Sequence, residues 1–151
     1  MADLLNNTNS NANNYGDDAN VTLSPRKHIR LSPGMYVGVV GDGSQPDEAL
    51  YVLIKEVVDN SIDEFIMGAG RQIDITLADN VVTVRDYGRG IPLKSLAAAV
   101  GQMNTGGKYG GDAFKKTVGL NGVGVKAVNM LSEEFTARSV RDGEARTVTF
   151  A

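Results

Sequence analysis

Apolar and polar residues recur with helical spacing between residues 47 and 67, and this pattern predicts the clearest helix of the chain. Glycines at positions 68 and 70 indicate where it ends. One side of the helix is expected to consist of Leu50, Ile54, Val57, Val58, Ser61 and Phe65. The opposite side is polar, because positions i, i+3, i+4 and i+7 stack on one face. Its residues are Glu56, Asp59, Asn60 and Asp63.

Shorter patterns predict two β-hairpins and two further helices. The paired segments are residues 72–77 with 81–85, and residues 134–140 with 145–150. The helices are expected over residues 93–100 and 124–131. Nearer the N-terminus, turns are expected at Ser24-Pro25 and Ser32-Pro33-Gly34, and residues 35–40 are predicted to be extended.

This order of elements favours an α+β fold over a Rossmann unit. The expected architecture is a two-layer sandwich, in which a mixed or antiparallel sheet is covered by helices on one face. Residues 1–20 are rich in asparagine and poor in apolar side chains, so burial cannot offset the entropy of ordering them. We therefore expect a flexible N-terminal arm over residues 1–24 and a domain over residues 25–151.

Composition excludes several classes of function. The 151 residues include no cysteine and a single histidine, His28, so disulfides, thiolate metal sites and cysteine nucleophiles are excluded and a histidine triad is disfavoured. No apolar run approaches the roughly 20 residues of a membrane span, and no signal-peptide pattern is present. A cytoplasmic protein with no membrane partner fits these features. The net charge of −3 gives no reason to expect this segment to bind nucleic acid by itself.

The polar helix face is the first of three clusters that could carry chemistry. One interpretation is a solvated surface. The other places a general base, Glu56, one turn from a cation ligand, Asn60, because Mg²⁺ prefers oxygen ligands. The helix has one lysine, Lys55, so the acids are expected to lack i, i+4 partners, and an asparagine in mid-helix has poor helix propensity.

Residues 86–92, Asp-Tyr-Gly-Arg-Gly-Ile-Pro, form the second cluster at the end of a predicted strand. They can be read as a turn with two conformationally free glycines. They can also be read as a loop whose backbone approaches a ligand while Asp86 faces the pocket. A carboxylate only accepts hydrogen bonds, so it pairs with the amino group of adenine and not with the oxygen of guanine.

Eight of the 18 glycines lie in residues 101–124 and mark the third cluster. This stretch is either a slack loop or an anion site, because backbone N–H groups at a helix N-terminus bind phosphates. Lys108 would add positive charge, although the residue order is not that of a Walker A loop. Each cluster alone is ambiguous. Together, a base with a cation ligand, a carboxylate for an amine and a phosphate cradle are the parts that an ATP site requires.

These motifs resemble, in order and spacing, the ATP-site motifs of the GHKL superfamily, which includes type IIA topoisomerases, Hsp90 chaperones, MutL-type proteins and sensor histidine kinases. The motifs are Glu56-Val-Val-Asp-Asn-Ser-Ile-Asp-Glu64, Asp86-Tyr-Gly-Arg-Gly-Ile-Pro92 and Gly119-Leu-Asn-Gly-Val-Gly124. Residues 33–38 and 104–109 are similar to the ATPase (B) subunits of bacterial type IIA topoisomerases, without separating gyrase from topoisomerase IV. The resemblance implies a Bergerat-type ATP-binding fold.

The resemblance also implies ATP and Mg²⁺ as cofactors and a role for each site residue. Glu56 would be the general base, Asn60 would bind Mg²⁺, and Asp86 would hydrogen-bond the adenine amino group. Further nucleotide-binding residues are expected to be Tyr15 of the arm, Arg89, Gly90, Ile91 and Pro92 around the adenine, and Lys108, Gly119, Leu120, Asn121, Gly122, Val123 and Gly124 at the phosphates. Arg89 is also expected to pair with Glu64.

For the whole protein, the resemblance implies a type IIA DNA topoisomerase. ATP would drive closure of a homodimer through this domain and the N-terminal arm, and a DNA-cleaving A subunit would be the partner in passing one duplex through another. The chain stops before the strand with the family's second adenine-pocket threonine and before the transducer domain. These residues alone are therefore expected to hydrolyse ATP poorly or not at all. The alternative is a non-catalytic nucleotide-binding or dimerisation module.

Three positions depart from the family pattern. Tyr87 stands where aspartate is common, Asn121 where many members have histidine, and Phe114 where a tyrosine often donates to the adenine ring. Asn121 can still donate to a phosphate, whereas Phe114 cannot make the tyrosine's bond.

Overall fold

The computed structural model describes residues 22–103 and 123–151. Its helices are α1 (Pro25–Leu31), α2 (Gly34–Val37), α3 (Ala49–Ile66), α4 (Leu96–Gly101) and α5 (Gly124–Leu131), with a 3-10 turn, η2 (Leu93–Ser95), before α4. Its strands are β1 (Ile73–Ala78), β2 (Val81–Asp86), β3 (Phe135–Arg141) and β4 (Glu144–Phe150). The helix predicted over residues 47–67, the two hairpins and the helices over residues 93–100 and 124–131 are confirmed.

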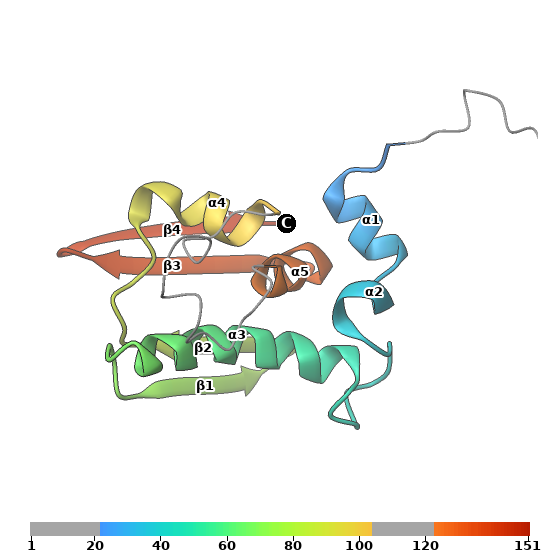
Figure 1. Ribbon diagram of the computed structural model, residues 1–151, viewed down its shortest axis with the longest axis horizontal. Helices are drawn as coiled ribbons and strands as arrows, with labels where there is room; N and C mark the ends of the chain where they lie inside the picture. Colours follow the sequence, from blue (N-terminus) through green and yellow to red (C-terminus); the bar gives the residue numbers. More distant parts are fainter. Residues whose placement is uncertain (1–21, 104–122) are drawn as a thin grey trace, which may run out of the picture.

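The strands form two antiparallel hairpins, β1–β2 and β3–β4, each a two-stranded sheet. In the first, Ile73 lies opposite Asp86; in the second, Phe135 lies opposite Phe150. Helix α3 runs along the first hairpin, α4 lies along the second, and α5 lies between α3 and α4 (Figure 1). Helices packed on antiparallel strands confirm the predicted α+β class.

The segment before α3 differs from the sequence-based expectation, because Pro25–Leu31 forms a helix that was not predicted. Ser24 caps it by accepting a hydrogen bond from the Lys27 N–H at 3.4 Å, and Pro25 occupies the first turn, where its missing N–H is tolerated. The prediction of an extended segment over residues 35–40 is wrong for the first half of that range. Helix α2 begins after Pro33, and only Val39 makes a β-bridge, with Glu48.

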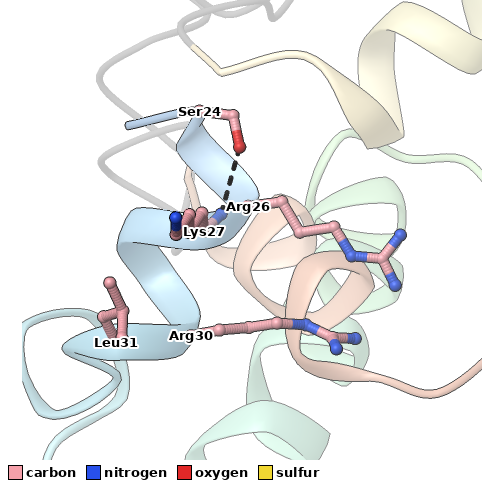
Figure 2. A pocket seen from close by; sticks show the side chains of 5 residues that line it. All are labelled: Ser24, Arg26, Lys27, Arg30 and Leu31. Atoms are coloured by element: carbon pink, nitrogen blue, oxygen red, sulfur yellow. Dashed lines mark hydrogen bonds between the residues drawn. The ribbon is translucent and has the colours of Figure 1, made fainter. Parts of the chain in front are cut away.

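The side chain of Arg30 connects helix α1 to the C-terminal end of α5. Arg30 donates from Nε to the Met130 carbonyl at 2.8 Å and from Nη2 to the Ser132 carbonyl at 2.9 Å. Carbonyl groups at a helix C-terminus lack intrahelical donors, and a guanidinium also complements the negative end of the helix dipole. Figure 2 shows Arg26 and Arg30 extending to the same side of α1, as their i, i+4 spacing requires.

The core lies where α2, α3 and α5 meet. Val37, Ala49 and Ala127 are buried there. Ile29 and Leu96 are fully buried elsewhere in the molecule. A buried hydrogen bond of 2.9 Å from Asn129 Nδ2 to the Val100 carbonyl joins α5 to α4. This packing fixes the start of α5 beside the middle of α3.

Candidate functional site

The polar face of α3 is partly buried. Asp59 is 7% exposed and Asp63 4% exposed, so the interpretation as a solvated face is wrong for both residues. Lys55 Nζ lies 2.5 Å from Asp59 Oδ2, so the expectation that the acids lack an i, i+4 partner is also wrong for Asp59. The hydrogen bond to Asp59 raises the pKa of the Lys55 ammonium above its ordinary value.

Glu56 and Asn60 lie one turn apart on this face, as predicted. A Cβ atom on Gly124 would collide with the Glu56 carboxylate, so this side chain lies directly against the backbone at the start of α5. Asn60 donates from Nδ2 to the Glu56 carbonyl at 2.6 Å. The first N–H groups of a helix have no intrahelical acceptor. A carboxylate therefore lies beside the N-terminal N–H groups of a helix, which are groups of the kind that bind anions.

Asp86 is the last residue of β2, and its carboxylate is held by two donors. Oδ1 accepts from the Gly88 N–H at 2.8 Å, and Oδ2 lies 3.5 Å from the Ser61 hydroxyl of α3. Asp86 lines an open hollow of about 220 Å³ with Ser61 and Phe65, residues 69–73 and Tyr87. Sequence reasoning placed Ser61 on the side of α3 that faces away from the acids, but missed its contact with Asp86.

Arg89 and Glu64 form the ion pair that the resemblance implied, which is confirmed. Arg89 Nη2 lies 2.9 Å from Glu64 Oε1, and Arg89 Nε and its backbone N–H both donate to Glu64 Oε2 at 3.1 and 3.0 Å. The hydrogen bond and the charge of Glu64 raise the pKa of the Arg89 guanidinium. The pair fixes one end of the loop that follows β2 against α3.

The next three residues, Gly90, Ile91 and Pro92, lie against β3. Ser139 donates from its hydroxyl to the Ile91 carbonyl at 2.8 Å, and Arg141 donates from Nη1 to the Gly90 carbonyl at 3.3 Å. Sequence reasoning missed both donors. The available signal was the alternation of β3, because Ser139 and Arg141 occupy positions in phase with the half-buried Phe135 and Ala137.

Tyr87, one of the departures from the family pattern, points into a polar cluster on the first hairpin. Its hydroxyl donates to Asp74 Oδ2 at 2.7 Å, and Gln72 donates to Asp74 Oδ1 at 2.7 Å. These bonds lower the pKa of Asp74, and the bond to Asp74 raises the pKa of Tyr87. The guanidinium of Arg85 lies 4.6 Å from the centre of the Tyr87 ring.

The structure brings together only part of the predicted site. Helix α3 contacts the start of α5 through Glu56, the end of β2 through Ser61 and the following loop through Glu64. The hollow beside Asp86 is not lined by Glu56, Asn60 or residues 90–92. Outside the described residues lie Tyr15, Lys108, Gly119, Leu120, Asn121 and Gly122, so their predicted roles stay predictions, as does the arm over residues 1–24.

Other features of the described residues lie apart from these positions. A depression of about 340 Å³ on α1 is lined by Ser24, Arg26, Lys27, Arg30 and Leu31, none of which is a predicted site residue (Figure 2). Within residues 22–103 and 123–151, no three His, Asp or Glu side chains gather into a metal-binding group. No helix in the same ranges has the length and apolar character needed to cross a membrane.

Comparisons with known proteins show which family the sequence resembles. The family model of histidine kinase-, DNA gyrase B- and HSP90-like ATPases matches residues 45–151. The chain is 54% identical over 138 residues to the B subunit of DNA topoisomerase 4 from Borreliella burgdorferi, covering 91% of this chain and 23% of that protein. It is 41% identical over 149 residues to the B subunit of DNA gyrase from Rickettsia conorii, covering 93% of this chain and 18% of that protein. The chain therefore spans about a fifth of the length of these curated relatives.

Proposed function

Because the chain belongs to the histidine kinase-, DNA gyrase B- and HSP90-like ATPases, we propose that it is the ATP-binding portion of a type IIA topoisomerase B subunit. The observation that carries the proposal is the contact between Glu56 and Gly124. It places a carboxylate, which can accept a proton, beside a helix N-terminus, which favours phosphate. Hydrolysis of a phosphoanhydride is accelerated when a base and a phosphate-binding group lie together.

In the proposed reaction, Glu56 would accept a proton from the attacking water. The water oxygen would bond to the γ-phosphorus while the bond from that phosphorus to the β–γ bridging oxygen breaks, and the products would be ADP and inorganic phosphate. Most of the rate enhancement in such reactions comes from positioning and from stabilising charge. The position of Glu56 would matter as much as its basicity.

Mg²⁺ fits the donor chemistry at Asn60. The amide nitrogen of this side chain donates to the Glu56 carbonyl, so its oxygen is the atom that can ligate a cation. A hard cation that keeps several waters needs few protein oxygens when phosphates supply others. When bound, Mg²⁺ would neutralise charge on the phosphates.

Recognition of the base would depend on Asp86 and the loop after it. The Gly88 N–H and the Ser61 hydroxyl hold the Asp86 carboxylate, which would accept from the adenine amino group. Gly90, Ile91 and Pro92 would form a wall beside the ring, called the adenine wall below. Arg89 would stand at its rim, paired with Glu64.

In the whole protein, this portion would close a homodimer when ATP binds, with Tyr15 of the arm reaching the partner's nucleotide and Lys108 and residues 119–124 holding the phosphates. A DNA-cleaving A subunit and duplex DNA would be the further partners. The relatives' names, which are those of the B subunits of DNA topoisomerase 4 and DNA gyrase, support the proposed link to DNA and to a further subunit.

Calorimetric titration of the chain with a non-hydrolysable ATP analogue and Mg²⁺ tests the proposed binding. Asp86→Asn should weaken binding at least about tenfold, because the substitution removes a charged acceptor and presents a donor to the adenine amino group. Asp142→Asn, at the exposed turn of the second hairpin, is the matched control and should leave the affinity unchanged. Equal affinities for both variants would remove Asp86 from the base site.

Hydrolysis is best tested in a chimera in which this chain replaces the matching segment of the Borreliella burgdorferi protein. Glu56→Gln should abolish ATP turnover there and change nucleotide affinity less than about twofold, because the amide keeps the shape and loses the base. Turnover by this variant would exclude Glu56 as the base. A chimera that binds nucleotide without hydrolysing it would support the alternative, a non-catalytic nucleotide-binding module.

A further inference from the structure

The second hairpin presents a row of hydrogen-bond donors to the loop that runs from β2 to α4. Ser139 and Arg146 lie directly opposite each other in the β3–β4 register, and Arg141 follows Ser139 by two positions, so all three share one face. Ser139 donates to the Ile91 carbonyl, and Arg141 to the Gly90 carbonyl. Arg146 Nη1 donates to the Leu93 and Lys94 carbonyls at 2.8 and 3.4 Å. Four main-chain acceptors are thereby bound by one strand pair.

Ser139 is the buried member of this row. Ser139 is 4% exposed, whereas its neighbours in the sequence, Arg138 and Val140, are exposed. A hydroxyl at a buried strand position destabilises a protein unless it finds a partner. Its partner is the Ile91 carbonyl at 2.8 Å, an ordinary distance for a bond from a hydroxyl to a carbonyl oxygen. The burial and the bond together give this serine a defined task in holding Ile91.

Close contact with β3 also restrains the same loop at Gly90. Gly90 has a φ of +72°, which side-chain-bearing residues rarely adopt. A Cβ atom at this position would also collide with the Val140 carbonyl and the Ser139 side chain. The loop therefore lies directly on β3 at Gly90, the residue next to Ile91.

We propose that Ser139 is a positioning residue that sets the adenine wall, Gly90, Ile91 and Pro92, at the distance required for a purine ring. This inference rests on the proposed function. In this role Ser139 would act through the Ile91 carbonyl and would not itself contact the nucleotide. Its contribution is therefore to recognition of the base, separately from binding of the phosphates at the start of α5.

Two ligands separate these contributions in one calorimetric experiment with Mg²⁺. The first is a non-hydrolysable ATP analogue, and the second is inorganic tripolyphosphate, which has no base. Ser139→Ala should weaken binding of the ATP analogue about fivefold, the equivalent of one hydrogen bond, and leave tripolyphosphate affinity within about twofold. A general loss of structure would weaken binding of both ligands.

Two further variants control the result. Ser139→Thr keeps the hydroxyl and should restore affinity for the ATP analogue to within about twofold of the unmodified chain. Thr136→Ala removes an exposed hydroxyl from the same strand, one that pairs with Thr149 at 2.9 Å, and should affect neither ligand. Thermal unfolding of each variant checks that the chain is folded at the titration temperature.

The outcomes distinguish failure of the inference from failure of the proposed function. If the unmodified chain binds the ATP analogue and Ser139→Ala binds it equally well, the positioning role is wrong and the proposed function stands. Equal weakening of both ligands, or failure of Ser139→Thr to restore binding, also overturns the positioning role. If the unmodified chain binds neither ligand, both proposals are wrong.

Discussion

The two hairpins have nearly the same geometry and make different contributions to the site. Each is an antiparallel pair in continuous register, and each is closed by a turn with positive φ angles. The first hairpin ends in Asp86, so it directly supplies a side chain that is a candidate for binding the nucleotide. The second holds no predicted site residue. Its side chains instead bind the main-chain carbonyls of the loop that follows the first.

The difference extends to what each hairpin packs against. On the first, Ile75 and Leu77 are 53% and 71% exposed, and the polar cluster around Asp74 joins neighbouring residues of the same hairpin. On the second, Phe135 and Phe150 face each other with ring centres 6.4 Å apart, and the Phe150 ring lies against Gly101 of α4. The first hairpin contributes a candidate binding group, the Asp86 carboxylate. The second hairpin holds neighbouring segments in position.

The sharpest test of this comparison is Gly90→Ala, where the first hairpin's loop meets the second hairpin. Alanine at a φ of +72° is strained, and its Cβ would collide with the Val140 carbonyl. We expect a loss of about 3 kcal/mol in the free energy of unfolding, measured by urea denaturation.

Gly143→Ala is the matched control. Gly143 has a φ of +81° in the turn of the second hairpin, and no atom lies within 4 Å of the position of its missing Cβ. Only the backbone strain remains, about 1 kcal/mol. Equal losses for the two variants would show that contact with β3 adds nothing to the conformational restraint at Gly90.

An arginine from each hairpin gives a smaller effect. Arg146→Ala removes donors to the Leu93 and Lys94 carbonyls and should reduce the free energy of unfolding by about 1 kcal/mol. Arg85→Ala removes a stacking contact with Tyr87 and should reduce it by no more than about 0.5 kcal/mol. Urea denaturation of both variants checks the order, and the reverse order would contradict the assignment of positioning to the second hairpin.

The smallest effect is a titration confined to the first hairpin. The pKa of Tyr87 lies above its ordinary value of 10.0, because its neutral hydroxyl donates to Asp74. This contribution to stability is complete below the unfolded-state pKa and is lost as the pH rises through the folded-state pKa. Asp74→Asn should move the pKa of Tyr87 back toward 10, as followed by tyrosinate absorbance. Thr136→Ala in the second hairpin should leave the titration unchanged.

At acidic pH the hydrogen bonds of Asp74 give stability the opposite dependence on pH. The pKa of Asp74 is held below its ordinary value of 3.8, first by the Gln72 bond and then by the Tyr87 bond. Its contribution to stability is present above that ordinary value and is lost as the pH falls through the folded-state pKa. Gln72→Ala should therefore raise the pKa of Asp74, as followed by NMR of its carboxyl carbon. An unchanged value would show that the Gln72 bond does not persist in solution.

The elements with sustained patterns could be predicted from the sequence. Helix α3 and both hairpins could be predicted because apolar periodicity over many residues indicates which side chains share a face. Helix α1 was missed because it has seven residues, too few to establish a period. Ser24-Pro25 was interpreted as a turn, although a serine cap before a proline is also the signature of a helix start.

Contacts between distant segments could not be predicted in the same way. Periodicity identified the face that carries Asp59 and Asp63 but not the packing that buries them. The ion pair of Arg89 with Glu64 followed from the family resemblance and is present. The alternation of β3 could have placed Ser139 on the inward face, but nothing in the sequence identified Ile91 as its partner, because that depends on which loop the second hairpin contacts in the folded chain.

The bond from Ser139 to Ile91 also sets an order of events during synthesis. Its two residues are 48 positions apart in the sequence. At elongation rates of about 5–20 residues per second, Ser139 is polymerised roughly 2–10 seconds after Ile91. Until then the Ile91 carbonyl of the nascent chain has only solvent or transient partners, even if α3 and the first hairpin have already left the ribosome. Newly made chains thus pass through an interval in which Asp86 at the end of β2 has been synthesised and Ile91 still lacks its contact with β3.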